Sequence, residues 1–515
     1  MGKTVVESLE DLLSDSGSLW APEREFREYC KKKCVSLRDL NKIIDNHRIT
    51  KYVTPDGSVY YTTSDISKIE NQAAAHVNRI LNEYDRPRIP IEEIDKILAK
   101  AREETGITLH EQQREAVIAG VNNGFVVITG GPGTGKTCTL VTLCYCLRRI
   151  FFGVDIRFTA PTGKAARRIT ESTGQPAKTV QKELAITPEN KKKKFFKGGI
   201  LIVDEVSMLD MVTANMVFES IHNGQKIILV GDINQLPSVG PGAVLRDLLW
   251  ANDRHPGVVP FVQLTKTFRQ ANDSNLFQNI CRIRNEGNWK LKEADDFQVV
   301  KVNDDPTQQL LDLVKQEINK YGIDNVACLL PYRKKGLLCS NRINGLIQSM
   351  INPISFGTPH IKVIKTEDEI SREVTFAVGD PVMQLVNRRE CANGDVGKIV
   401  SIENHCLIVQ YLDATVRYTK KDIAEELDLA YSMSINKSQG SEYASVVMGI
   451  TMDHKAMLKR NLVYTGITRA KKRCVLLQDD EAMKIAISTE DEYNRTTFFA
   501  EKVQYLRLKN KYRIA

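Results

Sequence analysis

The sequence predicts an α/β protein built on two parallel β-sheets, with smaller segments before and within them. Short apolar runs alternate with helical patterns from about residue 106 to 266. A second alternating region begins near residue 325 and resumes at 444–478. The glycine-rich segment GGPGTGKT (130–137) joins an apolar run to a helical pattern. Alternation of this kind is typical of parallel strands covered by helices.

The bulk composition sets broad limits. A chain of 515 residues predicts three or four domains, at about 100–200 residues per domain. The formal net charge of +8 permits a basic groove for a polyanion without requiring one. With no run of about 18 apolar residues, no membrane span is expected. The 11 cysteines lack paired CxxC spacing, which favours thiols in a reducing, intracellular compartment, cytoplasmic or nucleoid-associated, or nuclear if the source is eukaryotic or viral.

Residues 1–100 are polar and rich in helical patterns. Within them KYVTPDGSVYYT (51–62) predicts two short strands around a Pro-Asp-Gly turn. Helical patterns on both sides suggest a winged-helix-like domain. Such a domain could contact nucleic acid, or it could serve only for packing or for docking a protein partner.

The first alternating region contains five apolar runs that we expect to be strands. They are Phe125–Thr129, Ile156–Ala160, Ile200–Asp204, Ile227–Val230 and Val262–Leu264. Between the second and third runs, residues 172–199 are polar and basic without core periodicity, so they predict a surface insertion such as a hairpin. In the second region, short alternating strands within 390–428 predict a small inserted β-barrel.

The glycine-rich segment has the pattern of a phosphate-binding P-loop, GxxxxGK[ST], in the strand-then-helix context that this motif requires. Gly131, Gly133 and Gly135 allow backbone N–H groups to surround phosphates at a helix N-terminus. Lys136 is expected to reach the outer phosphates, and the Thr137 hydroxyl to bind Mg²⁺. ATP with Mg²⁺ is therefore the expected cofactor.

Two further strand ends carry polar groups that complement the P-loop. LIVDEVSM (201–208) ends in Asp204, placed to hold Mg²⁺, and Glu205, placed to polarise the attacking water. In LVGDINQLPSVGPG (229–242), Asp232 and Gln235 lie where a γ-phosphate sensor is expected. For the second pair, a turn that satisfies its own backbone is the alternative.

Taken in order, these segments resemble the RecD-like helicases of superfamily 1B over residues 105–480. The segments that carry the resemblance are LHEQQREAV, GGPGTGKT, APTGKAA, VDEVSM, GDINQLPSVGPG, TFRQ, LLPYRKKG, VGDPVMQLVN, NGDVG, INKSQGSE and YTGITRA. The resemblance implies two RecA-like motor domains, at 101–266 and 267–515. It further implies a pin-like insertion at 172–199, an SH3-like barrel at 390–428, and ATP-driven 5′ to 3′ movement on single-stranded DNA with unwinding at single-strand/duplex junctions.

The resemblance also assigns residues. As nucleotide contacts it implies Gln113, Gly131, Pro132, Gly133, Thr134, Gly135, Lys136, Thr137, Asp232, Gly440 and Glu442. As cationic fingers that stabilise the transferring phosphoryl group it implies Arg269 and Arg469. As nucleic-acid contacts it suggests Pro161, Thr162, Pro237, Val239, Asn387, Asn436 and Ser438.

Two positions depart from the family pattern, and one basic run has several interpretations. Asn436 and Gln181 stand where the family usually has histidine, which predicts altered coupling or preference rather than loss of ATP hydrolysis. Lys191–Lys194, followed by two phenylalanines, is interpreted as a solvated loop, a strand-separating pin or a nuclear targeting patch.

Other functions remain open at the level of sequence. A nucleic-acid-stimulated ATPase could remodel a complex without unwinding, and a related RNA helicase could carry the same motor. The pin-like insertion and the barrel favour a translocating DNA helicase. Protein partners are not specified, although residues 1–100 could bind them.

Overall fold

The computed structural model describes residues 3–185, 196–222, 224–253, 255–268, 274–355, 357–367, 370–412, 414–490 and 495–514. It divides into two compact units, one of residues 1–161, 169–269 and 491–515 and one of residues 162–168 and 270–490. Among the helices described, none is both long and apolar enough to cross a membrane.

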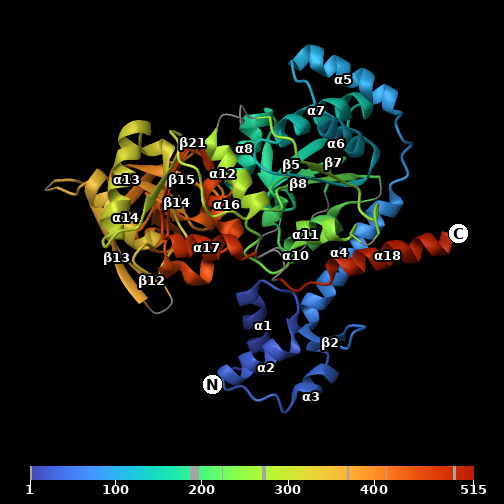
Figure 1. The fold of residues 1–515 in the computed structure, drawn as a ribbon, viewed down its shortest axis with the longest axis horizontal. Helices are drawn as coiled ribbons and strands as arrows, with labels where there is room; N and C mark the ends of the chain where they lie inside the picture. Colours follow the sequence, from blue (N-terminus) through green and yellow to red (C-terminus); the bar gives the residue numbers. More distant parts are fainter. Residues whose placement is uncertain are drawn as a thin grey trace. The chain divides into compact units, whose positions relative to one another are not determined.

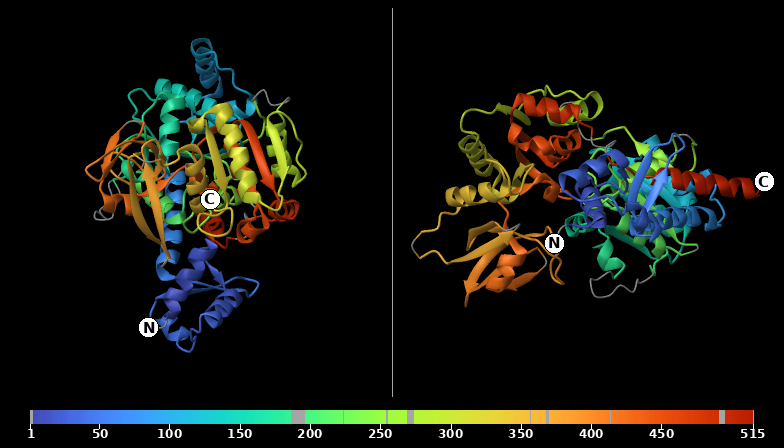
Figure 2. Two further views of the ribbon diagram at one scale, coloured as in Figure 1. Left: turned by 90° about the vertical axis from the view of Figure 1, so that its left-hand side faces the viewer. Right: turned by 90° about the horizontal axis from the view of Figure 1, so that it is seen from below.

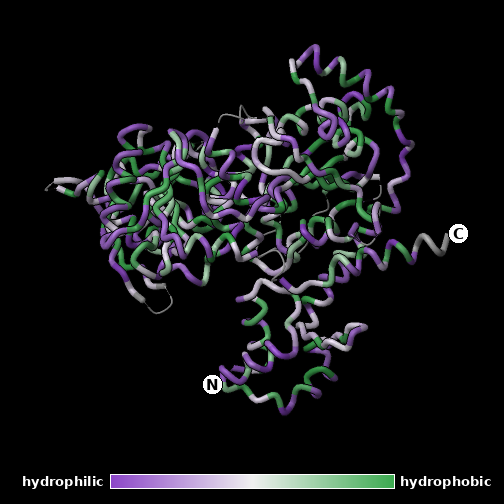
Figure 3. Tube along the Cα trace, in the orientation of Figure 1, coloured by the Kyte–Doolittle hydropathy of each residue, from purple (hydrophilic) through white to green (hydrophobic). Residues whose placement is uncertain are grey.

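The chain begins with a small α/β segment (blue in Figure 1). Its elements are α1 (Val5–Ser16), β1 (Ala21–Pro22), α2 (Glu23–Lys32), α3 (Leu40–Asp45), β2 (Ile49–Val53) and β3 (Val59–Thr63). The three strands form an antiparallel sheet in the order β1-β3-β2. The two predicted strands around the Pro-Asp-Gly turn are thus confirmed, with Gly57 at φ +85° in the turn. Hydrophobic residues recur along α1 in Figure 3, and they include the buried Leu9 and Leu13.

The C-terminal helix belongs to the first unit, whereas the sequence placed residues 491–515 in the second motor domain. α18 (Phe499–Ile514) packs on α4 (Ser64–Glu83) and α11 (Val244–Trp250), and Figure 1 shows α18 beside α4. The fully buried Glu70 of α4 accepts hydrogen bonds from the Trp20 indole (2.9 Å), the Phe498 backbone (2.8 Å) and the Lys502 ammonium (2.5 Å). A buried carboxylate requires such partners, and they fix the helix in place.

The first unit contains a parallel six-stranded sheet in the order β6-β5-β7-β8-β4-β9. Its strands are β4 (Phe125–Gly130), β5 (Ile156–Ala160), β6 (Ala177–Thr179), β7 (Ile200–Val203), β8 (Lys226–Gly231) and β9 (Phe261–Leu264). All five predicted strands are confirmed. Every residue of β4, β7 and β8 is buried, as expected for strands covered on both faces.

Helices accompany this sheet. They are α5 (Ile91–Thr105), α6 (Glu111–Asn122), α7 (Lys136–Ile150), α9 (Val180–Glu183), the short η1 (Val206–Met208) and α10 (Met211–Ser220). Helix α8 (Gly163–Thr173) is divided between the two units after Arg168.

Residues 172–199 differ in part from the predicted insertion. Strand β6 pairs in parallel with β5 and extends the main sheet, and α9 follows it directly. Val180 and Leu184 are buried in the core, and so is Phe196, at 3% exposure. The prediction failed for these residues because the edge strand has only three positions, too few to show periodicity. Lys191–Lys194 and Phe195 lie outside the described residues.

The second unit contains a parallel five-stranded sheet in the order β10-β21-β20-β11-β19. Its strands are β10 (Phe297–Lys301), β11 (Val326–Leu330), β19 (Ser432–Ser434), β20 (Tyr443–Ile450) and β21 (Ala470–Gln478). Helical elements of this unit are α12 (Asn275–Cys281), η2 (Arg282–Glu286), α13 (Pro306–Tyr321), η3 (Ile323–Asn325), α14 (Ser340–Ile351), η4 (Ile435–Ser438), η5 (Met452–Met457), α16 (Arg460–Ile467) and α17 (Asp480–Ser488).

An antiparallel five-stranded sheet interrupts this unit in the order β17-β16-β15-β14-β18. It comprises β14 (Pro381–Gln384), β15 (Val396–Glu403), β16 (Cys406–Gln410), β17 (Thr415–Tyr418), α15 (Lys420–Glu426) and β18 (Leu427–Leu429). Figure 2 shows its strands in orange, apart from the yellow and red strands of the parallel sheet. The insertion predicted at 390–428 is therefore present but begins earlier, at β14. A hairpin of β12 (His360–Glu367) and β13 (Ile370–Ala377) precedes it and was not predicted.

Candidate functional site

The P-loop connects the end of β4 to the start of α7. Gly133 and Gly135 have φ angles of +72° and +79°, a region that only glycine enters without strain. A Cβ at Gly135 would lie 2.1 Å from the amide nitrogen of Gln113. The loop thus needs glycine at this position for its backbone angle and for the close approach of Gln113.

Lys136 is the first residue of α7 and is half-buried. Its ammonium donates to the carbonyl oxygens of Gly130 (2.5 Å) and Gly131 (3.1 Å). The next residue, Thr137, is exposed. A cation and free N–H groups at the start of a helix attract anions, so this segment has the chemistry to hold phosphates.

Gln113 ties α6 to the P-loop. Its side-chain oxygen accepts from the His110 backbone (2.9 Å), and its side-chain nitrogen donates to the carbonyl oxygen of Thr134 (3.2 Å). Only 4% of Gln113 is exposed. Each end of an amide can form a second hydrogen bond, so the residue can position the loop and still contact a base.

Asp204 and Glu205 follow β7. The Asp204 backbone donates to the carbonyl oxygen of Thr159 (2.9 Å), and its carboxylate accepts from the Glu205 backbone (2.7 Å). Glu205 has φ +53° and ψ +41°. This left-handed conformation is strained for glutamate and is enriched at functional sites. This backbone conformation ends the extended strand at Glu205.

Asp232 and Gln235 follow β8, which lies between β4 and β7 in the sheet. Asp232 is fully buried and accepts from the backbone N–H of Asn234 (3.0 Å). The Gln235 backbone donates to the Asp232 carbonyl (3.2 Å). The side-chain oxygen of Gln235 is buried, in a residue 7% exposed, and has no hydrogen-bond partner among the described residues. A buried amide oxygen without a donor is costly and indicates a place for a further hydrogen-bond donor.

These residues fit a bound Mg²⁺–ATP. Parallel strands direct their carboxyl ends to one edge of the sheet, so the P-loop, the Asp204–Glu205 pair and the Asp232–Gln235 turn share that edge. The P-loop glycines leave room for phosphates, and the Gln235 side-chain oxygen, which has no donor among the described residues, could accept a hydrogen bond from the attacking water. Thr137 and Asp204 offer the oxygen ligands that Mg²⁺ prefers.

In the second unit, Arg469 lies between α16 and β21 and is 3% exposed. Its guanidinium donates to the carbonyl oxygens of Thr465 (3.1 Å) and Ser441 (3.2 Å) and to the Thr468 hydroxyl (3.2 Å). Within this unit its bonds to the Ser441 carbonyl join it to the INKSQGSE segment. The other predicted finger, Arg269, lies outside the described residues.

The predicted nucleotide contacts Gly440 and Glu442 border Ser441. Gly440 has φ +73°, and a Cβ there would lie 3.2 Å from the Thr162 hydroxyl. Glu442 forms ion pairs with Arg168 (2.5 Å) and Lys471 (3.3 Å). Glu442 therefore already has two cationic partners, which orient its carboxylate.

Asn393 of the NGDVG segment is bonded by the predicted nucleic-acid contact Asn387 and by Lys437, which lies between the predicted contacts Asn436 and Ser438. The Asn387 side-chain oxygen accepts from the Asn393 backbone (2.9 Å), and the Lys437 ammonium donates to the Asn393 side chain (2.8 Å). The side-chain oxygen of Asn436 is buried without a partner among the described residues. Ser438 is fully buried, and its hydroxyl donates to the Ile435 carbonyl (2.7 Å).

Sequence reasoning missed a cluster of cations at this place. Burial, together with the charges of Arg333 and Lys164, lowers the pKa of Lys437. These three cations come from segments far apart in the sequence, so no local pattern could have grouped them. Each stands in a quoted motif (LLPYRKKG, APTGKAA or INKSQGSE), and that was the available signal. Crowded cations of this kind suit a phosphate backbone.

The remaining predicted nucleic-acid contacts lie in the first unit. Pro161 and Pro237 are half-buried. Val239 is 82% exposed, unusual for an apolar side chain in a loop whose neighbour Ser238 is 2% exposed.

Two protein families match the chain. Residues 113–241 match the family described as "AAA domain", and residues 429–477 match the "UvrD-like helicase C-terminal domain". The first match covers the P-loop and both polar strand ends of the first sheet. The second covers INKSQGSE and Arg469.

Similar proteins include helicases. The "ATP-dependent RecD2 DNA helicase" of Deinococcus radiodurans is 30% identical over 401 residues, which cover 77% of this chain and 52% of that protein. The chain thus spans about half the length of this relative. The "RecBCD enzyme subunit RecD" of Haemophilus influenzae is 26% identical over 508 residues, covering 81% of this chain and 76% of the subunit.

Among solved structures, "Bacteroides Pif1 bound to ssDNA" is similar at 20% identity and a TM-score of 0.45, over 73% of this chain and 94% of that one. The two family matches fall one in each parallel sheet and include the motifs named above. The chain is therefore similar to the RecD2 helicase and to the RecD subunit over most of its own length.

Proposed function

We propose that this chain is an ATP-driven DNA helicase that moves 5′ to 3′ on single-stranded DNA and unwinds duplexes. The observation that carries the proposal is the meeting of three phosphate-handling elements at one edge of the first sheet. In the same chain, a second parallel sheet carries Arg469 and the INKSQGSE segment. A motor that couples hydrolysis to stepping needs both a nucleotide site and a second element that responds to it.

Bound Mg²⁺–ATP would supply the phosphoanhydride bond to be hydrolysed. We propose that the P-loop N–H groups and Lys136 hold its phosphates, with Thr137 and Asp204 on the metal ion. Glu205 would accept a proton from the attacking water, and the Gln235 amide would bond the γ-phosphate and lose that partner after hydrolysis. Gln113 would contact the adenine.

We propose that the second sheet completes the motor. Arg469 would stabilise charge on the transferring phosphoryl group, as cationic fingers do in other nucleotide hydrolases. Gly440 and Glu442 would position the loop that carries this arginine. The domain boundaries are those predicted above, except that α18 is assigned to the first motor domain.

Nucleic acid would be held by modest contacts that can be broken and remade. Backbone tracking suits Thr162, Asn387 and Asn436, supported by the cations Lys437, Lys164 and Arg333. Ser438 would act by holding its loop, because its hydroxyl is committed to Ile435. Pro161, Pro237 and Val239 would pack against sugars or bases.

The test is ATP-dependent unwinding of matched partial duplexes with a 5′ or a 3′ single-stranded tail, made in DNA and in RNA. We expect unwinding of the 5′-tailed DNA alone. Preference for the 3′ tail would contradict the polarity, and preference for RNA would contradict the substrate. ATP hydrolysis stimulated by DNA without unwinding of any substrate would instead indicate a remodelling ATPase.

A further inference from the structure

The loop that carries Pro237 and Val239 is bound by a residue more than two hundred positions further along the chain. Arg495 precedes α18 and belongs to the first unit, as the loop does. Its guanidinium donates to the Ser238 hydroxyl (3.2 Å) and to the carbonyl oxygens of Gly240 (3.1 Å), Gly242 (2.8 Å) and Ser238 (2.7 Å). One side chain thus binds three alternate positions of a five-residue segment, Ser238–Gly242.

The N-terminal segment closes the other side of this guanidinium. A Cβ at Gly17 would lie 2.6 Å from the central carbon of the Arg495 guanidinium. The Gly17 carbonyl in turn accepts from the Gly242 backbone (2.9 Å). Gly17 has φ +67°, so both its conformation and its lack of a side chain are needed for this packing.

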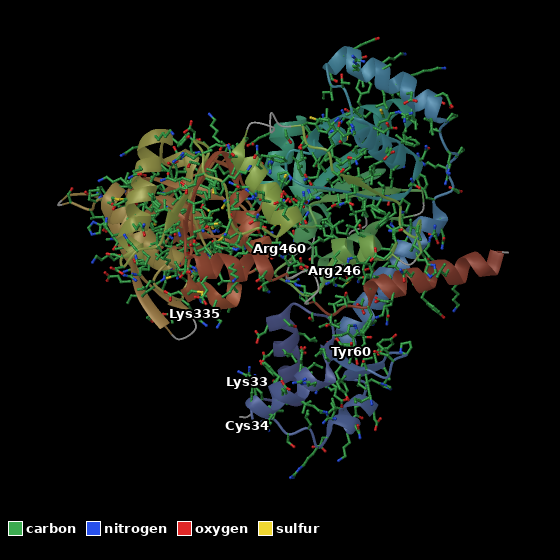
Figure 4. The ribbon with its side chains drawn as sticks, in the orientation of Figure 1. Lys33, Cys34, Tyr60, Arg246, Lys335 and Arg460 are labelled. Carbon is green, nitrogen blue, oxygen red and sulfur yellow. The ribbon has the colours of Figure 1, made fainter. Side chains whose placement is uncertain are left out.

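Neighbouring contacts hold the segment that carries Arg495. The Thr496 carbonyl accepts from the backbones of Leu19 (2.9 Å) and Trp20 (3.1 Å). Arg246 of α11, labelled in Figure 4, donates to the Thr497 hydroxyl (2.8 Å). Thr496 and Thr497, which follow Arg495, are therefore held by the N-terminal segment and by α11.

The loop that Arg495 binds is rigid at its backbone and exposed at its tip. Ser238 is 2% exposed, and its hydroxyl also donates to the Gly240 carbonyl (2.8 Å). Between these two anchored residues, the Val239 side chain is 82% exposed. An apolar side chain held out into solvent on a fixed backbone is prepared for contact with another molecule. Preorganisation of this kind lowers the entropy lost on binding.

We propose that Arg495 is a positioning residue that holds the Ser238–Gly242 loop so that Val239 meets single-stranded DNA. The inference rests on the proposed function and deepens it, because it ties the DNA contact to the two chain-terminal segments. Arginine suits the role because its planar fork can reach four acceptors at once, whereas lysine has a single nitrogen.

The test measures DNA-stimulated ATP hydrolysis by the full chain as a function of oligothymidylate concentration. For Arg495→Ala we expect the half-stimulating DNA concentration to rise about tenfold, with turnover at saturating DNA largely kept, because loop ordering is added to the cost of binding. Arg495→Lys should recover part of the loss. Lys509→Ala removes a cation from an exposed position of α18, the helix that follows Arg495, and should behave as the wild type.

A double-mutant cycle separates positioning from loss of packing. Val239→Ser alone should raise the half-stimulating concentration, and Arg495→Ala combined with Val239→Ser should add little to Arg495→Ala, because the two residues act as one unit. Strict additivity would overturn the proposal. The proposal would also be overturned if turnover at saturating DNA fell while the half-stimulating DNA concentration stayed the same. That result would mean that Arg495 acts on ATP hydrolysis, through Gln235, and not on DNA binding.

Two results keep this inference separate from the proposed function. If the wild type shows no stimulation by DNA, the proposed function fails. If the wild type is stimulated and Arg495→Ala responds to DNA as the wild type does, only the positioning role is wrong. Thermal unfolding of each variant identifies a folding defect, and in that case the result for Arg495→Lys decides.

Discussion

Two lysines lie at opposite ends of the same parallel sheet, and they differ in how they are bound. Lys136 follows the carboxyl end of β4, is half-buried and donates to two P-loop carbonyls. Lys226 is the first residue of β8 and is 2% exposed. Its ammonium donates to the carbonyl oxygens of Gly120 (2.9 Å), Val121 (2.7 Å) and Asn123 (2.6 Å).

The rings of Tyr84 and Phe151 complete the surroundings of Lys226, at 4.6 and 5.6 Å from its nitrogen. Lys226 closes the C-terminal end of α6, where carbonyl oxygens lack helical partners. The lesson is that a buried cation alone does not indicate a functional site. Lys226 is enclosed by fixed acceptors, whereas Lys136 sits in a glycine-rich loop where phosphates can replace its carbonyl partners.

The largest expected effect tests the functional lysine. Lys136→Ala should lower ATP hydrolysis by at least about a thousandfold, because the cation that stabilises the phosphates is removed. Thermal unfolding should change little, since the side chain forms only two bonds within its own loop. The measurement is steady-state ATP hydrolysis with and without DNA. If Lys136→Ala lost as much stability as a variant with a core substitution, Lys136 would also have a structural role, as Lys226 does.

The next effect concerns the strained carboxylate at the same edge of the sheet. Glu205→Gln should slow hydrolysis by about several hundredfold while leaving ATP binding intact, because an amide cannot accept the proton from water. A fluorescent ATP analogue measures binding, and single-turnover hydrolysis measures the chemical step. Turnover at the wild-type rate would show that Glu205 is not the general base.

The third prediction extends the comparison to a buried cation of the second sheet. Arg469→Ala should reduce DNA-stimulated turnover by about a hundredfold and leave nucleotide affinity within about threefold. Like Lys136, Arg469 donates to neutral oxygens that a phosphate could replace. Unchanged DNA-stimulated turnover would mean that Arg469, like Lys226, has only a structural role. Arg473→Ala is a suitable contrast, because that arginine is paired with Glu317 (2.9 Å).

Sequence patterns located the nucleotide edge but not the groups that support it. Lys136, Glu205 and Gln235 follow apolar runs within short motifs, so their local order was enough to place them. Lys226 stands in GQKIILV, where it looks like the polar flank of a strand, because its partners lie about a hundred residues earlier. Arg495 was not identified from the sequence for the same reason, because its partners in Ser238–Gly242 lie more than two hundred residues earlier.

Long-range packing also explains the errors in the domain organisation. α18 follows the second sheet in sequence, yet the buried Glu70 of α4 accepts from Phe498 and Lys502 and draws it to the first unit. The inserted sheet was recognised from β15, β16 and β17 because they alternate clearly. Strand β14 lies between β15 and β18, and its burial does not alternate, so the predicted boundary of 390 came late.

The smallest effect on activity is expected for the structural lysine. Lys226→Met should lower the free energy of unfolding by about 3 kcal/mol, because three buried carbonyl oxygens lose their donor. The specific activity of the folded protein should stay within about twofold of the wild type. Chemical denaturation combined with ATP hydrolysis below the transition measures both. If Lys226→Met were as stable as the wild type but hydrolysed ATP more slowly, Lys226 would not be a purely structural residue.

The pH dependence of stability sharpens this last prediction. Burial, with a smaller contribution from the charge of Arg86, lowers the pKa of Lys226 from 10.5 to about 7. Between these values the unfolded chain binds a proton that the folded chain does not, so this residue makes the wild type more stable as the pH rises. The gap in unfolding free energy between the wild type and Lys226→Met should therefore widen from pH 7 to pH 9. A constant gap would mean that the three carbonyls and two rings keep the Lys226 ammonium charged over this pH range.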